Sequence, residues 1–138
     1  MAARKKVSNN FTFAVGRRRT SVARVRLSRG SEQHIVNNIV IGEYFPGDEQ
    51  KRLWNRPFQI TQTEGKYHVT ARIEGGGKRG QLGAFVHGVA RALVALDSEN
   101  YKPLLRKCGL LTRDPRARQR RMVGMGGKSR RKKQSPKR

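Results

Sequence analysis

The stretch that decides the fold is KYHVTARIEGGGKRGQLGAFVHGVARALVAL, residues 66–96. Its beginning alternates apolar and polar side chains, which predicts a strand from Lys66 to Glu74 with one buried face. From Leu82 to Leu96 the large apolar residues recur at helical spacing, which predicts a helix of about four turns that packs one stripe against a sheet. A strand and a helix joined by a glycine turn indicate a domain that contains both kinds of element.

Two further strands are predicted upstream, at residues 11–15 and 21–27, because their side chains have period-two character. The second strand would bury one apolar face and place Arg24 and Arg26 on the other. We therefore expect a sheet with one wet, basic face.

The region between these strands and residue 66 gives weaker signals. Short β-branched runs at 34–37 and 39–41 suggest strand and turn, and residues 43–54 suggest short helical turns. The turn signal Thr63-Glu64-Gly65 makes residues 58–61 the expected hairpin partner of the strand that follows.

A shorter helix is predicted after the long one, with Pro103 in its first turn and Gly109 at its end. Its inward-facing residues would be Leu104, Leu105 and Cys108.

Beyond Leu111 the hydrophobic content falls away, and Asp114-Pro115 is expected to cap a brief basic helix that ends near Gly124. The predicted fold class is α+β: a single domain with a small mixed sheet packed by helices, and a long basic C-terminal extension. The expected divisions are a basic N-terminal extension at 1–10, a globular RNA-binding domain at 11–111 and a basic C-terminal tail at 112–138.

The charge of the chain is one-sided, with 32 Lys+Arg against 9 Asp+Glu and a formal net charge of +23. Residues 1–30 contribute +9, residues 31–111 contribute +3 and residues 112–138 contribute +11, so the excess lies at the two ends. Such an imbalance predicts a polyanionic partner.

No apolar run approaches the length of about 18 residues that a membrane span needs, and the single cysteine fits a reducing compartment.

The glycine turn at residues 75–80 invites comparison with a nucleotide-binding P-loop. Its last glycine is followed by Gln81 and Leu82, so the lysine and hydroxyl groups that hold phosphates and magnesium are missing. We therefore expect no NTPase chemistry and no small-molecule substrate. Two compatible interpretations stay open: an anion site for an RNA phosphate beside Lys78 and Arg79, and a purely structural tight turn.

Five arginines and no lysine lie between residues 17 and 26. They are Arg17, Arg18, Arg19, Arg24 and Arg26. A solvated charge run is the usual explanation of such a cluster. The guanidinium fork, however, makes bidentate phosphate contacts that lysine cannot copy, which favours an anchor on an RNA backbone.

The tail has no amphipathic stripe beside its cations, which favours nucleic acid over an anionic membrane.

Candidate catalytic and metal-binding groups are few. His34, His68 and His87 share no metal-like spacing with one another or with Cys108. His87 is expected on the solvent or RNA side of its helix, in register with Arg91, and Cys108 is expected to be a small buried residue. We predict no catalytic residue, no metal and no cofactor.

Several segments resemble bacterial-type small-ribosomal-subunit protein nine, in the order that this family has them. The matching segments are Gly16 to Val25, Glu43-Tyr44-Phe45, Gly75-Gly76-Gly77 with Gly80-Gln81, His87 to Leu93, Leu104 to Gly109, Leu111 to Arg116, and Lys137-Arg138. They cover nearly everything from residue 13 onward. Two features depart from the family: the Asn38 to Gly42 segment replaces a more usual polar turn, and the tail lacks the aromatic residue often found near its end.

The resemblance implies a left-handed βαβ crossover and docking, through ribosomal RNA, onto the small-subunit head beside neighbouring head proteins. It also implies a tail that reaches peptidyl-site tRNA, with Lys137 and Arg138 nearest the anticodon stem-loop. The residues expected to bind ribosomal RNA are Arg17, Arg18, Arg19, Arg24, Arg26, Lys78, Arg79, Arg113, Arg116, Arg118, Arg120, Arg121, Lys128, Arg130, Arg131, Lys132 and Lys133. The expected location is the ribosome of a bacterial cytoplasm, because no long transit-like leader is evident.

Two other functions remain open from the residues alone. An RNA-processing enzyme or its protein cofactor would share a related sheet, and a DNA-packaging protein would share the charge. Against the enzyme, residues 1–30 and 112–138 hold a single acid, too few for the paired carboxylates that divalent metals require. Against packaging, a sizeable folded core with two basic ends is more than that role requires.

Overall fold

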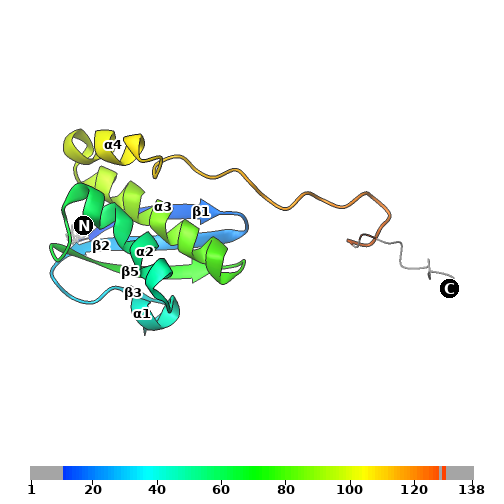
Figure 1. Ribbon diagram of the computed structural model, residues 1–138, viewed down its shortest axis with the longest axis horizontal. Coiled ribbons are helices and arrows are strands. Elements are labelled where there is room, and N and C mark those ends of the chain that lie inside the picture. The colour runs from blue at the N-terminus through cyan, green and yellow to red at the C-terminus, as the bar shows by residue number, and fades with distance from the viewer. Residues whose placement is uncertain (1–10, 128, 130–138) are drawn as a thin grey trace, which may run out of the picture.

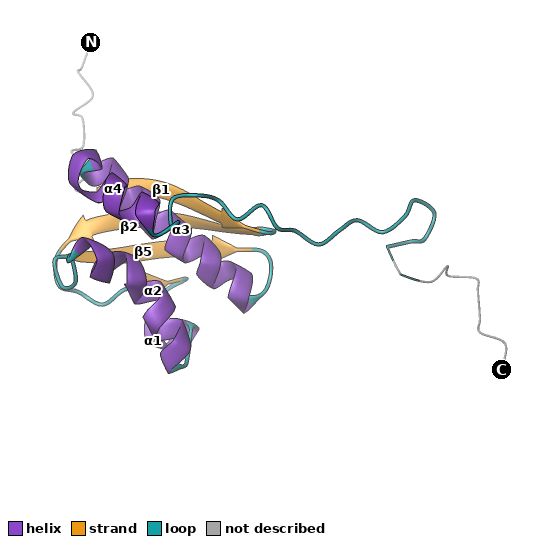
Figure 2. Cartoon of the chain, turned by 45° about the horizontal axis from the view of Figure 1, so that its top comes forward, coloured by secondary structure: helices purple, strands orange, loops and turns teal. Residues whose placement is uncertain are grey.

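The computed structural model describes residues 11–127 and 129. Its helices gather on one side of a sheet, and an irregular segment leaves the domain after the last helix (Figures 1 and 2). The elements in chain order are β1 (Phe11–Arg18), β2 (Ser21–Arg29), β3 (Ile35–Val36), β4 (Ile39–Val40), α1 (Ile41–Tyr44), α2 (Asp48–Thr61), β5 (Tyr67–Glu74), α3 (Lys78–Leu96) and α4 (Ser98–Lys107).

The described strands form one mixed sheet in the order β1-β2-β5-β3-β4. β2 pairs antiparallel with both β1 and β5, whereas β3 pairs parallel with β5. A parallel pair needs a crossover connection, and α2 lies on the one between β3 and β5. The predicted α+β class, with a mixed sheet packed by helices in a single domain, is confirmed. The left-handed sense of the crossover stays a prediction.

The core lies between the sheet and α3. Val25 of β2 and Val69 of β5 are fully buried, in one cluster with Phe85 and Leu93 of α3. In both strands, the residues that alternate with the buried ones point to the other side of the sheet. Arg24 and Arg26 of β2 and Arg72 of β5 are therefore exposed. The strand alternation and the helical stripe predicted for residues 66–96 therefore meet in one core.

Residues 58–61 are the last turn of α2, so the prediction of a strand there is wrong. Trp54, Phe58 and Thr61 are three to four residues apart and share one helix face, and α2 packs against α3. A segment of only four residues does not distinguish a strand from a helix by periodicity. The antiparallel partner of β5 is β2, which is far from it in sequence.

The helix α4 begins earlier than predicted, because the carboxylate of Asp97 caps it by accepting a backbone N–H at 3.2 Å. Pro103 therefore lies in the second turn. Leu105 is buried as predicted, but Leu104 and Cys108 are exposed, and that part of the prediction is wrong. Successive residues are about 100° apart around a helix, so Leu104 is exposed while Leu105 packs in the core, and Cys108 is the C-cap residue at the end of α4.

The brief helix predicted after Asp114 does not form, since residues 114–122 contain no helical turn. This stretch is rich in arginine and has almost no apolar side chain to pack, and short helices depend on such packing. The segment contacts the domain at Asp114, and its later described residues extend away from the sheet and helices (Figure 1). The remainder of the predicted tail, apart from Ser129, lies outside the described residues.

Candidate nucleic-acid interface

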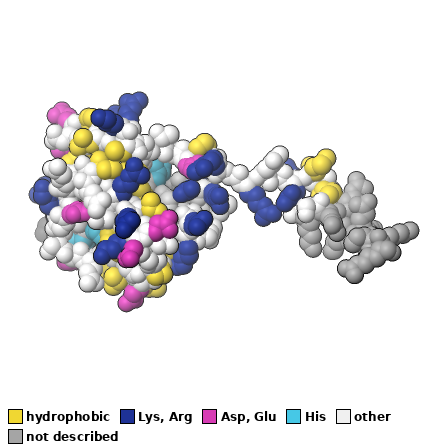
Figure 3. Space-filling view, viewed as in Figure 1, with side chains coloured by type: hydrophobic (Ala, Val, Ile, Leu, Met, Phe, Trp, Pro, Cys, Tyr) yellow, Lys and Arg dark blue, Asp and Glu magenta, His cyan; other side chains and the backbone are white. Residues whose placement is uncertain are grey.

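The hairpin between β1 and β2 places the predicted arginine cluster at one end of the sheet. Arg18 pairs with Ser21, so only Arg19 and Thr20 form the turn, and Arg19 has a left-handed φ of 53°. Arg17 and Arg19 are exposed. Lys and Arg side chains are gathered at the end of the domain where this hairpin turns and the C-terminal segment leaves (Figure 3).

Two of the five arginines have acidic partners. The Arg24 guanidinium lies 2.8 Å from a carboxylate oxygen of Glu74, and that of Arg18 lies 3.6 Å from Asp114. Arg18 also packs across α3, where a side chain at Gly83 would collide with it. The other members of the cluster have no carboxylate within 4.0 Å among the described residues. They are Arg17, Arg19 and Arg26.

The first residues of the C-terminal segment come to the same place. Asp114 accepts hydrogen bonds from the Arg116 guanidinium at 2.7 Å while it faces Arg18. These hydrogen bonds, with a smaller effect from the charge of Arg18, hold the pKa of Asp114 well below its usual range. Residues 17–19 and 113–116, far apart in sequence, are thus brought together around one permanently ionised carboxylate.

His87 was predicted to face solvent or RNA, and that prediction is wrong. Its ring is half-buried: Nδ1 accepts the backbone N–H of Arg17 at 3.2 Å, and Nε2 lies 3.3 Å from the carbonyl oxygen of Leu111. Both bonds require the neutral ring with its proton on Nε2. One helical turn on, Arg91 donates to the Val15 carbonyl at 2.6 Å. The two side chains therefore satisfy backbone groups of the edge strand β1 and tie it to the root of the C-terminal segment.

The stability of the domain should depend on pH through His87. Burial, and to a lesser extent the charges of Arg91 and Arg113, lower its pKa from the usual 6.5, while the hydrogen bond to Leu111 opposes this. The unfolded chain therefore binds protons first, so the free energy of unfolding should fall as the pH drops below about 6.5.

Urea unfolding at pH 7.5 and pH 5.5 checks this expectation. His87→Gln, which cannot be protonated, should show a smaller loss of stability between the two pH values than the parent chain. His34, whose pKa is also lowered by burial, contributes to the loss that remains. An identical loss in both proteins would contradict the role of His87.

The glycine turn before α3 lies against the arginine hairpin. Gly75 and Gly76 have φ values of 77° and 65°, and the Ser21 hydroxyl donates to the Gly75 carbonyl at 3.0 Å. A Cβ at Gly75 would come within 2.6 Å of the Thr20 carbonyl oxygen. These contacts support the structural interpretation of the turn.

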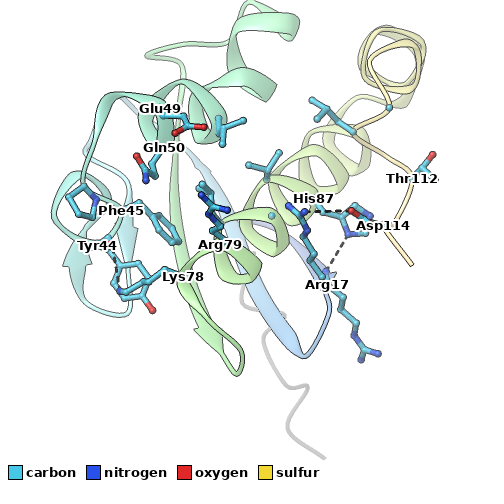
Figure 4. Close-up of a pocket in the computed structure, with 18 residues that line it drawn as sticks. Arg17, Tyr44, Phe45, Glu49, Gln50, Lys78, Arg79, His87, Thr112 and Asp114 are labelled. Atoms are coloured by element: carbon cyan, nitrogen blue, oxygen red, sulfur yellow. Dashed lines mark hydrogen bonds and ion pairs between the residues drawn. The ribbon is translucent and has the colours of Figure 1, made fainter. Parts of the chain in front are cut away.

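The two cations beside this turn differ in their surroundings. Lys78 is directed to Tyr44: its Nζ lies 3.4 Å from the ring centroid and 3.3 Å from the carbonyl oxygen. Arg79, together with Lys78 and the hairpin residues Arg17 and Arg18, lines a cavity of about 680 Å³ between α2, α3 and the C-terminal segment (Figure 4). Glu49 and Asp114 also line it, so its charge is mixed.

The remaining predicted residues are distributed along the chain. Arg113, Arg118, Arg120 and Arg121 are exposed on the described part of the C-terminal segment. The others lie outside the described residues: Lys128, Arg130, Arg131, Lys132, Lys133, Lys137 and Arg138. In the described ranges, no group of three His, Cys, Asp or Glu side chains is placed to hold a metal ion. None of the described helices is long and apolar enough to cross a membrane.

A comparison with protein families agrees with these observations. A family model described as Ribosomal protein S9/S16 matches residues 16–138. The match includes the arginine hairpin, the glycine turn, α3 and the whole C-terminal segment.

Proposed function

The chain belongs to the ribosomal protein S9/S16 family, and we propose that it is a structural, non-catalytic constituent of the small ribosomal subunit. In this proposal it binds ribosomal RNA in the subunit head, beside neighbouring head proteins. Membership of the family makes it a ribosomal protein with a role in translation. The choice of subunit, the RNA contacts and a bacterial cytoplasmic location are our proposals.

The RNA contact is proposed because two basic segments of the chain meet at Asp114. The hairpin arginines and the start of the basic C-terminal segment share one end of the domain, held there by the Arg18–Asp114 ion pair of 3.6 Å and the two bonds of His87. One phosphate backbone passing this end would meet cations from both segments. Such contacts fix the position of a protein on RNA without reading its sequence.

Sedimentation of the tagged chain in a cell lysate tests this function. We expect co-migration with small subunits and a loss of that migration after ribonuclease treatment. A chain that stays at the top of the gradient, or that follows DNA and resists ribonuclease, would contradict the proposal.

The tail carries the second part of the proposal, a contact with peptidyl-site tRNA. Residues 128–138 contain seven basic residues and no acid. The fifteen residues from Gly124 onward span up to about 50 Å if extended, more than the roughly 35 Å breadth of a hundred-residue domain. The chain is long enough to serve a site that its own domain does not touch, with Lys137 and Arg138 nearest the anticodon stem-loop.

Removal of Ser135 to Arg138 should weaken tRNA retention modestly and leave subunit assembly nearly intact. The globular domain and most of the tail cations remain, and exposed phosphate contacts are screened by salt. The measurement is tRNA dissociation from reconstituted small subunits at two salt concentrations. Equal dissociation rates at low salt, with and without these four residues, would remove the tRNA contact and leave the RNA anchor.

A further inference from the structure

One face of the sheet is not covered by any described helix (Figure 2); we call it the open face. Strand pairing places a single row of its residues across all five strands. The row consists of Phe13, Arg26, Thr70, Ile35 and Val40. A second row beside it holds Val15, Arg24 and Arg72.

Phe13 is the unusual member of this face. Its side chain is 52% exposed, although it lies in a regular strand whose neighbours Ala14 and Gly16 are buried on the other side. An exposed aromatic ring beside cations offers a base a π-face on which to stack.

The cations around Phe13 are held in place. Arg26 lies directly opposite Phe13 across the β1–β2 pair, and its guanidinium carbon is 5.1 Å from the centroid of the Phe11 ring. Arg24 lies diagonally to Phe13, a position within reach of long side chains. Two arginines thus occupy the positions opposite and diagonal to Phe13, with the guanidinium of Arg26 directed to Phe11 and that of Arg24 directed to Glu74.

We propose that the open face binds unpaired RNA, with one base stacked on Phe13 and the adjoining phosphates held by Arg26 and Arg72. The charge selects this occupant: three arginines occupy the middle of the face, against Glu74, which Arg24 engages at 2.8 Å, and Glu32, which lies 3.6 Å from His68 at one end of the face. A duplex does not offer a free base plane, whereas a loop or bulge does. This inference rests on the proposed binding of ribosomal RNA and adds the class of RNA that the sheet selects.

The test uses the full chain with two probes, a ten-nucleotide oligoadenylate that carries one 2-aminopurine and a ten-base-pair RNA duplex. Phe13→Leu keeps the exposed position apolar but removes the ring. It should weaken binding of the single strand about tenfold and abolish the stacking-induced change in 2-aminopurine fluorescence, while duplex binding changes less than about twofold. The matched control is Leu104→Ala on α4, a side chain that is 46% exposed and distant from the sheet; it should change neither probe.

The outcomes separate this inference from the proposed function. If Phe13→Leu leaves the single strand unaffected while alanine at Arg17 and Arg19 weakens both probes, the stacking site is wrong and the RNA anchor stands. If those alanines also have no effect, the RNA anchor itself fails. If light scattering shows that Phe13→Leu converts a dimer into a monomer, the face binds a second copy of the chain, and the RNA assignment is overturned.

Discussion

Replacing Gly16 with alanine is expected to force β1 away from α3 and to destabilise the domain by about 3 kcal/mol or more. A Cβ at Gly16 would collide with the backbone of α3, at the carbonyl oxygen of Ala84 and the amide nitrogen of Gly88. Neither group can turn aside as the end of a flexible side chain can. A loss of this size would remove a large part of the stability typical of a small domain.

The thermal midpoint should fall by roughly 15 °C for such a loss in a domain of about a hundred residues. Gly42→Ala is the matched control, because a Cβ there meets nothing within 4 Å, and it should be neutral or slightly stabilising. The displacement would also disturb the hydrogen bond from the adjacent Arg17 amide to His87. A midpoint within 3 °C of the parent would show that the strand and helix can separate at little cost.

The local patterns predicted the parts of the fold that depend on nearest neighbours. The alternation that ends at Glu74 and the stripe from Leu82 are visible in any short window, and both elements formed as predicted. The close approach of Gly16 to Gly88 joins residues far apart in sequence, and no local pattern encodes it. For the same reason residues 58–61 were misread: their partner in packing is α3, and the short run alone fits either kind of element.

In the candidate site too, local patterns predicted some features, and contacts between distant residues determined the others. That Arg24 and Arg26 would be exposed followed from period two, because the alternate positions of β2 had to be buried. That Glu74 would pair with Arg24, and Asp114 with Arg18, depends on strand register and on the path of the C-terminal segment. His87 offered one usable signal, its spacing of four from Arg91, but two polar residues on a helix face are more often solvated than bonded to a strand edge.

The largest functional effect is expected from the arginines without acidic partners. Binding to a ribosomal RNA fragment from the subunit head should weaken as salt is added, with a linear slope of log K against log salt concentration. Alanine at Arg17, Arg19 and Arg26 should reduce the magnitude of this slope by about 2 to 3. The corresponding loss of affinity near 0.1 M salt is about two orders of magnitude. Arg18 and Arg24 are left in place, because their charges are already offset by Asp114 and Glu74.

Two further variants separate a specific anchor from general charge. Alanine at Lys51, Arg52 and Arg56 of α2 removes the same charge from exposed positions elsewhere and should change the salt slope far less, because these residues lie outside the hairpin. Lysine at Arg17, Arg19 and Arg26 should retain most of the slope but lose affinity, because an ammonium group makes no bidentate phosphate contact. If the hairpin alanines leave the salt slope unchanged, or if the α2 alanines change it equally, the hairpin is no anchor and the affinity comes from the net charge of the whole chain.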